Sequence, residues 1–180
     1  MVSADLLPAV FLDRDGVLSR TTVFNRKSYA PRNLEDFKLL PNAINSVRRL
    51  KHFGFKVIVV TNQPDIGNGL VTAEIVEAMH NKLYRRTMVD DIFICAHRQD
   101  EGCQCRKPNP GMLIEASLKH SIDLTKSFMV GDRASDIEAG QRAGCRTVFI
   151  NRHYNEPHPI GANANVGSLQ SAVNFILANK

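Results

Sequence analysis

The chain has 180 residues, a length that suits one domain with a buried core. Hydrophobic residues make up 43% and charged residues 23%, as in ordinary globular proteins, and no apolar run is long enough to span a bilayer. The formal net charge of +5 would suit a nucleic-acid binder, but the basic residues are scattered and do not alternate with aromatic residues. We therefore expect no nucleic-acid partner and no membrane partner. Such a charge can instead attract an anionic substrate.

Short apolar segments alternate with amphipathic segments along the chain, a pattern typical of an α/β protein with a parallel sheet. Strands are predicted at residues 9–12, 55–60, 92–94, 128–130 and 147–150. Helices are predicted at residues 43–53, 72–83, 110–118, 135–143 and 168–177. No repeat or linker divides the chain, so residues 1–180 are expected to form one domain. The N-terminal residues 1–5 lack a basic region before an apolar core, which predicts no secretory signal and a cytoplasmic location.

Two segments carry more specific expectations. In the helix that follows Pro110, the inward stripe is predicted to consist of Leu113, Ile114, Ser117 and Leu118. The polar stretch 19–36 lies between the first strand and the first helix and contains four basic residues. We expect it to contact the substrate.

Polar residues follow several of the predicted strands directly. They are Asp13, Asp15, Thr61, Asn62, Asp132 and Asp136, and Lys107 lies after the third strand, just before a helix. Because ligands of open parallel sheets bind at the carboxyl ends of the strands, these side chains should meet at one crevice. Each match is weak by itself, but their order and shared placement form a specific combination.

These residue types suit the transfer of a phosphoryl group. A carboxylate can attack phosphorus only if the repulsion between two anions is cancelled, so we predict Asp13 as nucleophile and Asp132 as a ligand of Mg²⁺. Asp15 can lie on the same side as Asp13, protonate the leaving alcohol and then activate water. Thr61 and Lys107 can bind phosphoryl oxygens through a hydroxyl group and a point charge. The alternative interpretation is that these residues only cap helices and end strands.

Four segments together resemble the motifs of the haloacid dehalogenase-like (HAD) phosphohydrolases. They are residues 11–18, 60–63, 105–108 and 131–136. The resemblance implies a three-layer Rossmann-like fold with a central parallel sheet, and the spacing of the motifs leaves no room for a large cap domain. It also implies that Asp13, the backbone carbonyl of Asp15 and Asp132 hold Mg²⁺. Asp136 would then lie behind these ligands.

A cysteine–histidine pattern precedes Lys107. Cys95-x-His97 and Cys103-x-Cys105 offer three thiolates and one imidazole, a complete tetrahedral set for Zn²⁺. With all four positions filled by protein, no position remains to activate water, so this zinc is predicted to be structural and to stabilise the loop. The alternatives are free buried thiols or redox-active cysteines.

A zinc loop just before the lysine motif resembles one branch of the HAD family. That branch contains heptose bisphosphate phosphatases and histidinol-phosphate phosphatases, and it implies that Asn62, Gln63 and Arg106 bind substrate. We assign Arg133 to the same role. The expected partner is a small phosphorylated metabolite, and the protein is expected to be a monomer or a weak homo-oligomer. Heptose bisphosphate is the favoured substrate, histidinol phosphate is the alternative, and a non-catalytic binding scaffold is a third possibility.

Overall fold

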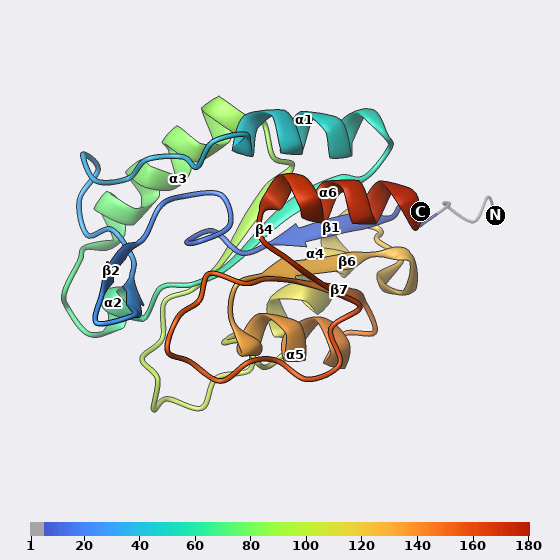
Figure 1. Cartoon of the computed structure of the whole chain (residues 1–180). Helices are drawn as coiled ribbons and strands as arrows, with labels where there is room; N and C mark the ends of the chain where they lie inside the picture. Colours follow the sequence, from blue (N-terminus) through green and yellow to red (C-terminus); the bar gives the residue numbers. More distant parts are fainter. Residues whose placement is uncertain (1–5) are drawn as a thin grey trace.

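A central sheet of six parallel strands organises the computed structural model, which describes residues 6–180 (Figure 1). The segment 1–5, on which the prediction of no secretory signal rests, lies outside the described residues. The strand order is β5-β4-β1-β6-β7-β8. In chain order the strands are β1 (Ala9–Leu12), β4 (Lys56–Asn62), β5 (Asp91–Cys95), β6 (Phe128–Gly131), β7 (Arg146–Ile150) and β8 (Ala164–Val166).

Helices cover both faces of this sheet, so the predicted three-layer α/β fold is confirmed. One face carries α1 (Ala43–His52), α3 (Ala73–Thr87) and α6 (Leu169–Ala178). The other face carries α4 (Gly111–His120) and α5 (Ala134–Arg142). Figure 1 shows α1 and α6 above the sheet and α5 below it. A short helix α2 (Pro64–Gly67) follows β4, and a 3₁₀ turn η1 (Leu124–Lys126) precedes β6.

Strand β1 is apolar throughout because both of its faces are buried. Val10 and Leu12 pack into the core beneath α1, α3 and α6, whereas Ala9 and Phe11 pack into the core beneath α4 and α5. Successive residues of a strand point to opposite faces, and both faces are covered, so all four side chains are fully buried.

Three helix ends have recognisable caps. Thr72 precedes α3, and its hydroxyl oxygen accepts the backbone N–H of Ile75. Ser168 caps α6 in the same way by accepting the N–H of Ser171. Helix α1 ends just before Gly54, whose φ of +86° is a left-handed conformation that favours glycine. Within residues 6–180, no helix is both long enough and apolar enough to cross a membrane.

The inward stripe predicted for α4 is partly wrong. Leu113 is buried as expected, but its partners in the core are Met112 and Ala116. Ile114 is 43% exposed and Leu118 is 79% exposed, so the buried face of the helix is formed by Met112, Leu113 and Ala116 and not by the predicted residues. The small side chain of Ala116 allows close packing against the sheet there, a preference that apolar spacing alone did not reveal.

Five elements were not predicted, including the 3₁₀ turn η1. The segment between β1 and α1 contains a hairpin of β2 (Thr22–Phe24) and β3 (Lys27–Tyr29), which forms its own two-stranded sheet. Strand β8 adds a sixth strand beside β7, and α2 forms directly after β4. Strand β4 also runs two residues further than predicted and includes Thr61 and Asn62.

Candidate active site

A cavity of about 500 Å³ opens at the carboxyl ends of β1 and β4, beside the residues that follow β6. It is lined by most of the predicted site residues, namely Asp13, Asp15, Thr61, Asn62, Gln63, Arg106, Lys107 and Arg133, and by Asp136. Parallel strands end at the same edge of the sheet, which is why residues so far apart in sequence meet here.

Lys107 lies at the centre of the buried polar groups. Its ammonium group is 2.7 Å from Oδ1 of Asp13 and 2.7 Å from Oδ1 of Asp136, and it donates to the carbonyl oxygen of Val60 at 2.8 Å. The side chain is only 2% exposed. The backbone N–H of Lys107 donates to Oδ1 of Asn62, and the amide of Asn62 donates back to the carbonyl of Lys107. These contacts fix both the backbone and the charge of Lys107.

Asp132 is buried without an ion-pair partner among residues 6–180. Both of its carboxylate oxygens are shielded from solvent and make no hydrogen bond of standard geometry there, and the nearby hydroxyl of Tyr154 only partly offsets the burial of the charge. The backbone of Gly16 passes so close that a Cβ atom there would lie 1.8 Å from Oδ2 of Asp132. An unpaired buried carboxylate costs free energy unless a cation or a hydrogen-bond donor reaches it.

One oxygen each from Asp13, Asp132 and Asp136 lies within 4.8 Å of the others; we call these three residues the acid cluster. When all three are ionised, the carboxylates exceed the single ammonium of Lys107 by two negative charges. Oxygen ligands with this excess charge fit a hard divalent cation such as Mg²⁺.

The pKa values of this group reflect its burial. Burial raises the pKa of Asp13 from 3.8 to about 6, although the charge of Lys107 acts in the opposite direction. Burial and the carboxylate of Asp13 raise the pKa of Asp132 well above 3.8. Burial alone would lower the pKa of Lys107, but Asp13 and Asp136 outweigh it and raise that pKa. The ammonium therefore stays charged, and further positive charge is needed before Asp13 and Asp132 ionise easily.

Asp15 faces a different set of partners. Its Oδ2 atom accepts from Nη2 and Nε of Arg14, at 2.7 and 3.0 Å, and from the amide of Gln63 at 2.7 Å. Its Oδ1 atom accepts from the hydroxyl of Ser19 at 2.9 Å. The Gln63 amide also donates to the hydroxyl oxygen of Thr61 at 2.9 Å. The side chain of Asp15 is thus fixed beside the acid cluster.

The sequence did not single out Arg14, although its guanidinium group is fully buried. Its Nη1 atom lies 3.1 Å from Nε2 of His80, on α3, and its Cζ atom lies 5.4 Å from the centre of the Phe37 ring. Burial and the charge of Arg14 lower the pKa of His80 to about 4, so the ring is neutral at pH 7 and Nε2 can accept the N–H. The only signal in the sequence is the position of Arg14 between the two acids.

Two arginines occupy the wall of the cavity. Nη1 of Arg106 is shielded from solvent and has no hydrogen-bond partner among the described residues. Nη2 of Arg133 donates to the hydroxyl and the carbonyl oxygen of Ser28 in β3, at 2.6 and 3.3 Å. Nη1 of Arg133 lies 3.5 Å from the carboxylate of Glu156. Arg133 therefore connects the hairpin to the segment that follows β7.

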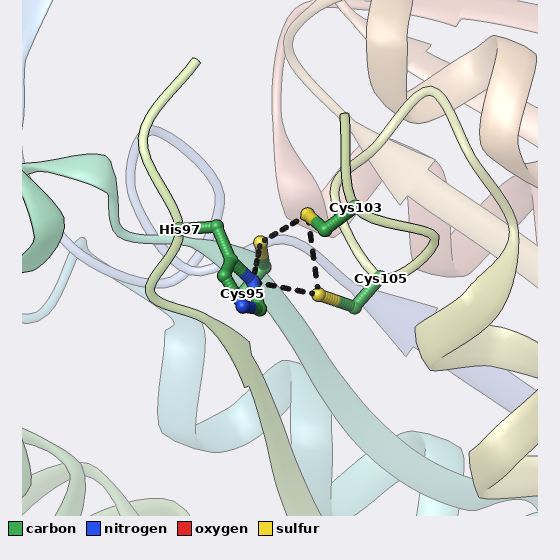
Figure 2. A group of neighbouring side chains, drawn as sticks. All are labelled: Cys95, His97, Cys103 and Cys105. Atoms are coloured by element: carbon green, nitrogen blue, oxygen red, sulfur yellow. Dashed lines mark hydrogen bonds between the residues drawn. The ribbon is translucent and has the colours of Figure 1, made fainter. Parts of the chain in front are cut away.

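The predicted zinc ligands come together at the end of β5 and in the loop that follows it, as Figure 2 shows. Cys95, His97, Cys103 and Cys105 form the cysteine–histidine cluster, and their ligand atoms lie within 4.8 Å of one another. The contacts between neighbouring ligand atoms are 3.2 to 3.6 Å. A tetrahedron with zinc–sulfur bonds of about 2.3 Å has edges of about 3.8 Å. The cluster therefore has nearly the size and the donor set of a structural zinc site, with all four cysteines of the chain free of disulfides.

Comparisons with known proteins point to one group. Residues 104–166 match a family model described as HAD-hydrolase-like. A D-glycero-beta-D-manno-heptose-1,7-bisphosphate 7-phosphatase of Yersinia pestis is 37% identical over 158 residues, which are 81% of each chain. A D-glycero-alpha-D-manno-heptose-1,7-bisphosphate 7-phosphatase of Photorhabdus laumondii is 34% identical over 157 residues, 80% of this chain and 82% of the relative.

A solved structure of a related phosphatase is similar to this chain along almost its whole length. The D,D-heptose 1,7-bisphosphate phosphatase from B. bronchiseptica, crystallised with magnesium and phosphate, superposes with a TM-score of 0.83 at 28% identity. The match covers 97% of this chain and 100% of that one.

Proposed function

Since the chain belongs to the HAD-like hydrolases, we propose that it is a Mg²⁺-dependent phosphatase in which Asp13 is the nucleophile and carries the phosphoryl group. The observation that carries this proposal is the acid cluster beside Lys107, with both oxygens of Asp132 buried and unpartnered. A scaffold without catalytic function would have no reason to retain such a costly arrangement.

In the first step, an oxygen of Asp13 forms a bond to phosphorus while the bond from phosphorus to the substrate oxygen breaks. Asp15 donates its proton to the leaving oxygen, so the departing group is a neutral alcohol. Lys107 and the hydroxyl of Thr61 bind the phosphoryl oxygens and hold the group in line with the attacking carboxylate.

In the second step, Asp15 accepts a proton from a water molecule as that water attacks the aspartyl-phosphate. The new bond joins the water oxygen to phosphorus, and the bond between phosphorus and Asp13 breaks. Inorganic phosphate leaves, and Asp13 returns to its carboxylate form. Asp15 ends the cycle with the proton that it needs for the next substrate.

Magnesium would be held by Asp13, Asp132 and, as the family resemblance implies, the backbone carbonyl of Asp15. It would offset the excess negative charge of the acid cluster and so favour the ionised form of Asp13. Asp136, which is 1% exposed and paired with Lys107, would hold that lysine in place.

For the substrate we propose the 7-phosphate of D-glycero-D-manno-heptose 1,7-bisphosphate. The names of the curated relatives support this choice over histidinol phosphate. The cavity also suits a second anionic group, because Nη1 of Arg106 is buried without a partner and Lys27 and Arg32 line the same space. Arg133, Asn62 and Gln63 would complete the contacts with the sugar.

The cysteine–histidine cluster is proposed to hold a structural Zn²⁺. Its four protein ligands would fill a tetrahedral site and leave no position for substrate. Cys95 ends β5 and Lys107 follows Cys105 by two residues, so a rigid cluster would set the position of Lys107. The single domain, the cytoplasmic location and the monomeric or weakly associated state stay predictions.

A panel of phosphorylated metabolites tests the proposed function. Phosphate release with Mg²⁺ is measured for both anomers of the heptose bisphosphate, for histidinol phosphate and for common sugar phosphates. We expect the heptose compound to have the highest kcat/KM, and we expect Asp13→Asn to remove phosphate release. Asp123→Asn is the matched control, since it neutralises a partly exposed carboxylate that caps the turn before β6 and does not line the cavity, and it should keep the rate.

Each outcome of the panel bears on a separate part of the proposal. A preference for histidinol phosphate would overturn the substrate and leave the mechanism intact. A normal rate in Asp13→Asn would overturn the nucleophile.

A further inference from the structure

The mechanism above gives no role to Arg14, the largest of the fully buried side chains. Burying a guanidinium group is costly, because it gives up strong hydration that only a close anion and good hydrogen bonds can replace. A buried arginine in the loop that carries the nucleophile therefore needs an explanation.

The charge of Arg14 has one compensating partner. Within residues 6–180, Asp15 provides the only carboxylate within 4 Å of the guanidinium group, at 2.7 Å. The remaining contacts, the ring nitrogen of His80 and the face of Phe37, carry no formal charge at pH 7. Arg14 and Asp15 thus form a largely buried ion pair in which two N–H groups of the arginine converge on the carboxylate, and this arrangement defines the geometry of the pair.

The guanidinium group is held on the side away from Asp15 as well. Its Nη1 atom reaches His80 on α3, and Phe37 from the segment before α1 covers it. Two N–H groups of Arg14 point at the same oxygen of Asp15, Oδ2. Because the guanidinium group is itself held by α3 and by the segment before α1, it fixes one side of the Asp15 carboxylate, and Gln63 and Ser19 hold the rest.

We propose that Arg14 is a positioning residue that orients Asp15 for proton transfer in both steps of the reaction. The inference rests on the proposed function, since Asp15 must be the acid and base for its orientation to matter. Arg14 itself does not contact the phosphoryl group in this scheme. Its effect on the rate passes entirely through Asp15.

The test compares two kinds of substrate in Arg14→Met, a variant of similar length without charge. A sugar phosphate has a poor leaving group and needs protonation by Asp15, so its kcat should fall by about 10²-fold with KM little changed. p-Nitrophenyl phosphate has a good leaving group that needs little protonation. It should still phosphorylate Asp13 quickly and give a burst of about one p-nitrophenolate per enzyme, followed by slow turnover.

A double-mutant cycle separates positioning from a general loss of structure. Because Arg14 acts through Asp15, Arg14→Met in an Asp15→Asn background should cost less than about 2-fold beyond Asp15→Asn alone. Arg14→Lys should recover part of the rate, since an ammonium can still reach Oδ2. Arg48→Met, on the exposed side of α1, controls for the loss of one arginine charge and should keep the wild-type rate.

Several results would overturn the inference. They are equal losses for both ester types without a burst, a loss carried by KM, or losses that multiply in the double variant. If Arg14→Met does not fold, the same cycle with Arg14→Lys decides the question. A wild-type protein without phosphatase activity would instead count against the proposed function, which keeps the two failures distinct.

Discussion

The acid cluster and the cysteine–histidine cluster are two candidate metal sites on neighbouring strands, and they are built in opposite ways. Asn62 in β4 pairs with Cys95 in β5, so the two sites begin almost side by side. The acid cluster is deeply buried and holds an unpartnered carboxylate, whereas the cysteine–histidine cluster has a complete tetrahedral donor set near the surface. A complete donor set suits stability, and an incomplete one leaves a position for substrate.

Loss of a zinc ligand should give the largest effect and would test whether the complete cluster is structural. Cys103→Ser removes one of four ligands, and we expect a loss of about 4 kcal/mol or more in the free energy of unfolding. Metal analysis should find about one zinc per chain in the wild type and much less in the variant. Cys145→Ala, which alters a buried thiol outside the cluster, should keep its zinc. An unchanged zinc content in Cys103→Ser would contradict the assignment.

Asp132→Asn should affect activity and stability in opposite directions. Activity should fall by about 10²-fold or more, because Mg²⁺ loses a charged ligand. In the presence of a chelator, however, the variant should be more stable by about 1–3 kcal/mol, since an uncompensated buried carboxylate is gone. Phosphate release measures the loss of activity, and urea unfolding with and without Mg²⁺ measures the change in stability. A metal-free variant less stable than the wild type would show that Asp132 is paired in solution.

The pH dependence of stability provides a further test of the acid cluster. The native state raises the pKa of Asp13 from 3.8 to about 6. A raised pKa means that the native state binds the proton more tightly, so this contribution to stability is fully present below pH 4 and is lost as the pH rises through 6. In the metal-free protein, the wild type should therefore lose stability relative to Asp13→Asn as the pH rises from 4 to 6.

His80 makes this comparison of two chains necessary. Its pKa is lowered from 6.5 to about 4, so its contribution is present above pH 6.5 and is lost as the pH falls through 4. In the wild type alone, the two trends oppose each other. The difference between wild type and Asp13→Asn cancels the histidine, because both chains contain it. A difference that stayed constant between pH 4 and pH 6 would refute the shift for Asp13.

The smallest effect is expected at the rim of the cavity, where charges are solvated. Arg32 lies 2.7 Å from Asp65, but its side chain is 48% exposed. Arg32→Ala should change the free energy of unfolding by less than about 1 kcal/mol. If the rim attracts the anionic substrate, KM should rise a few-fold, and added salt should reduce the difference. Arg142→Ala, which breaks an exposed pair with Glu138 on α5, is the control and should leave KM unchanged.

The sequence predicted the parts of the molecule that burial and strand ends control. β1 is apolar because helices cover both of its faces, and Asp13 and Lys107 converge because the strands are parallel. The cysteine–histidine cluster was predicted from spacing alone, since four ligand residues within eleven positions leave few other arrangements.

The features that the sequence did not predict depend on contacts between segments that are distant in the chain. The hairpin was missed because β2 is fully exposed and has no alternation of buried and solvent-facing residues. Arg14 was missed because its partners outside the motif, Phe37 and His80, are distant in sequence. In α4, the choice of Ala116 over Ile114 for the core depended on how closely the helix approaches the sheet.

The β2–β3 hairpin pairs only with itself and does not extend the central sheet. Its length and residues can therefore change during evolution without shifting the register that aligns the catalytic acids. It is held over the cavity by Arg133 through Ser28, and by the backbone of Asn155, which donates to the carbonyl of Arg26. Relatives that differ in this hairpin could acquire new substrate preferences while the chemistry is conserved, and exchanging hairpins between them is a direct route to altered specificity.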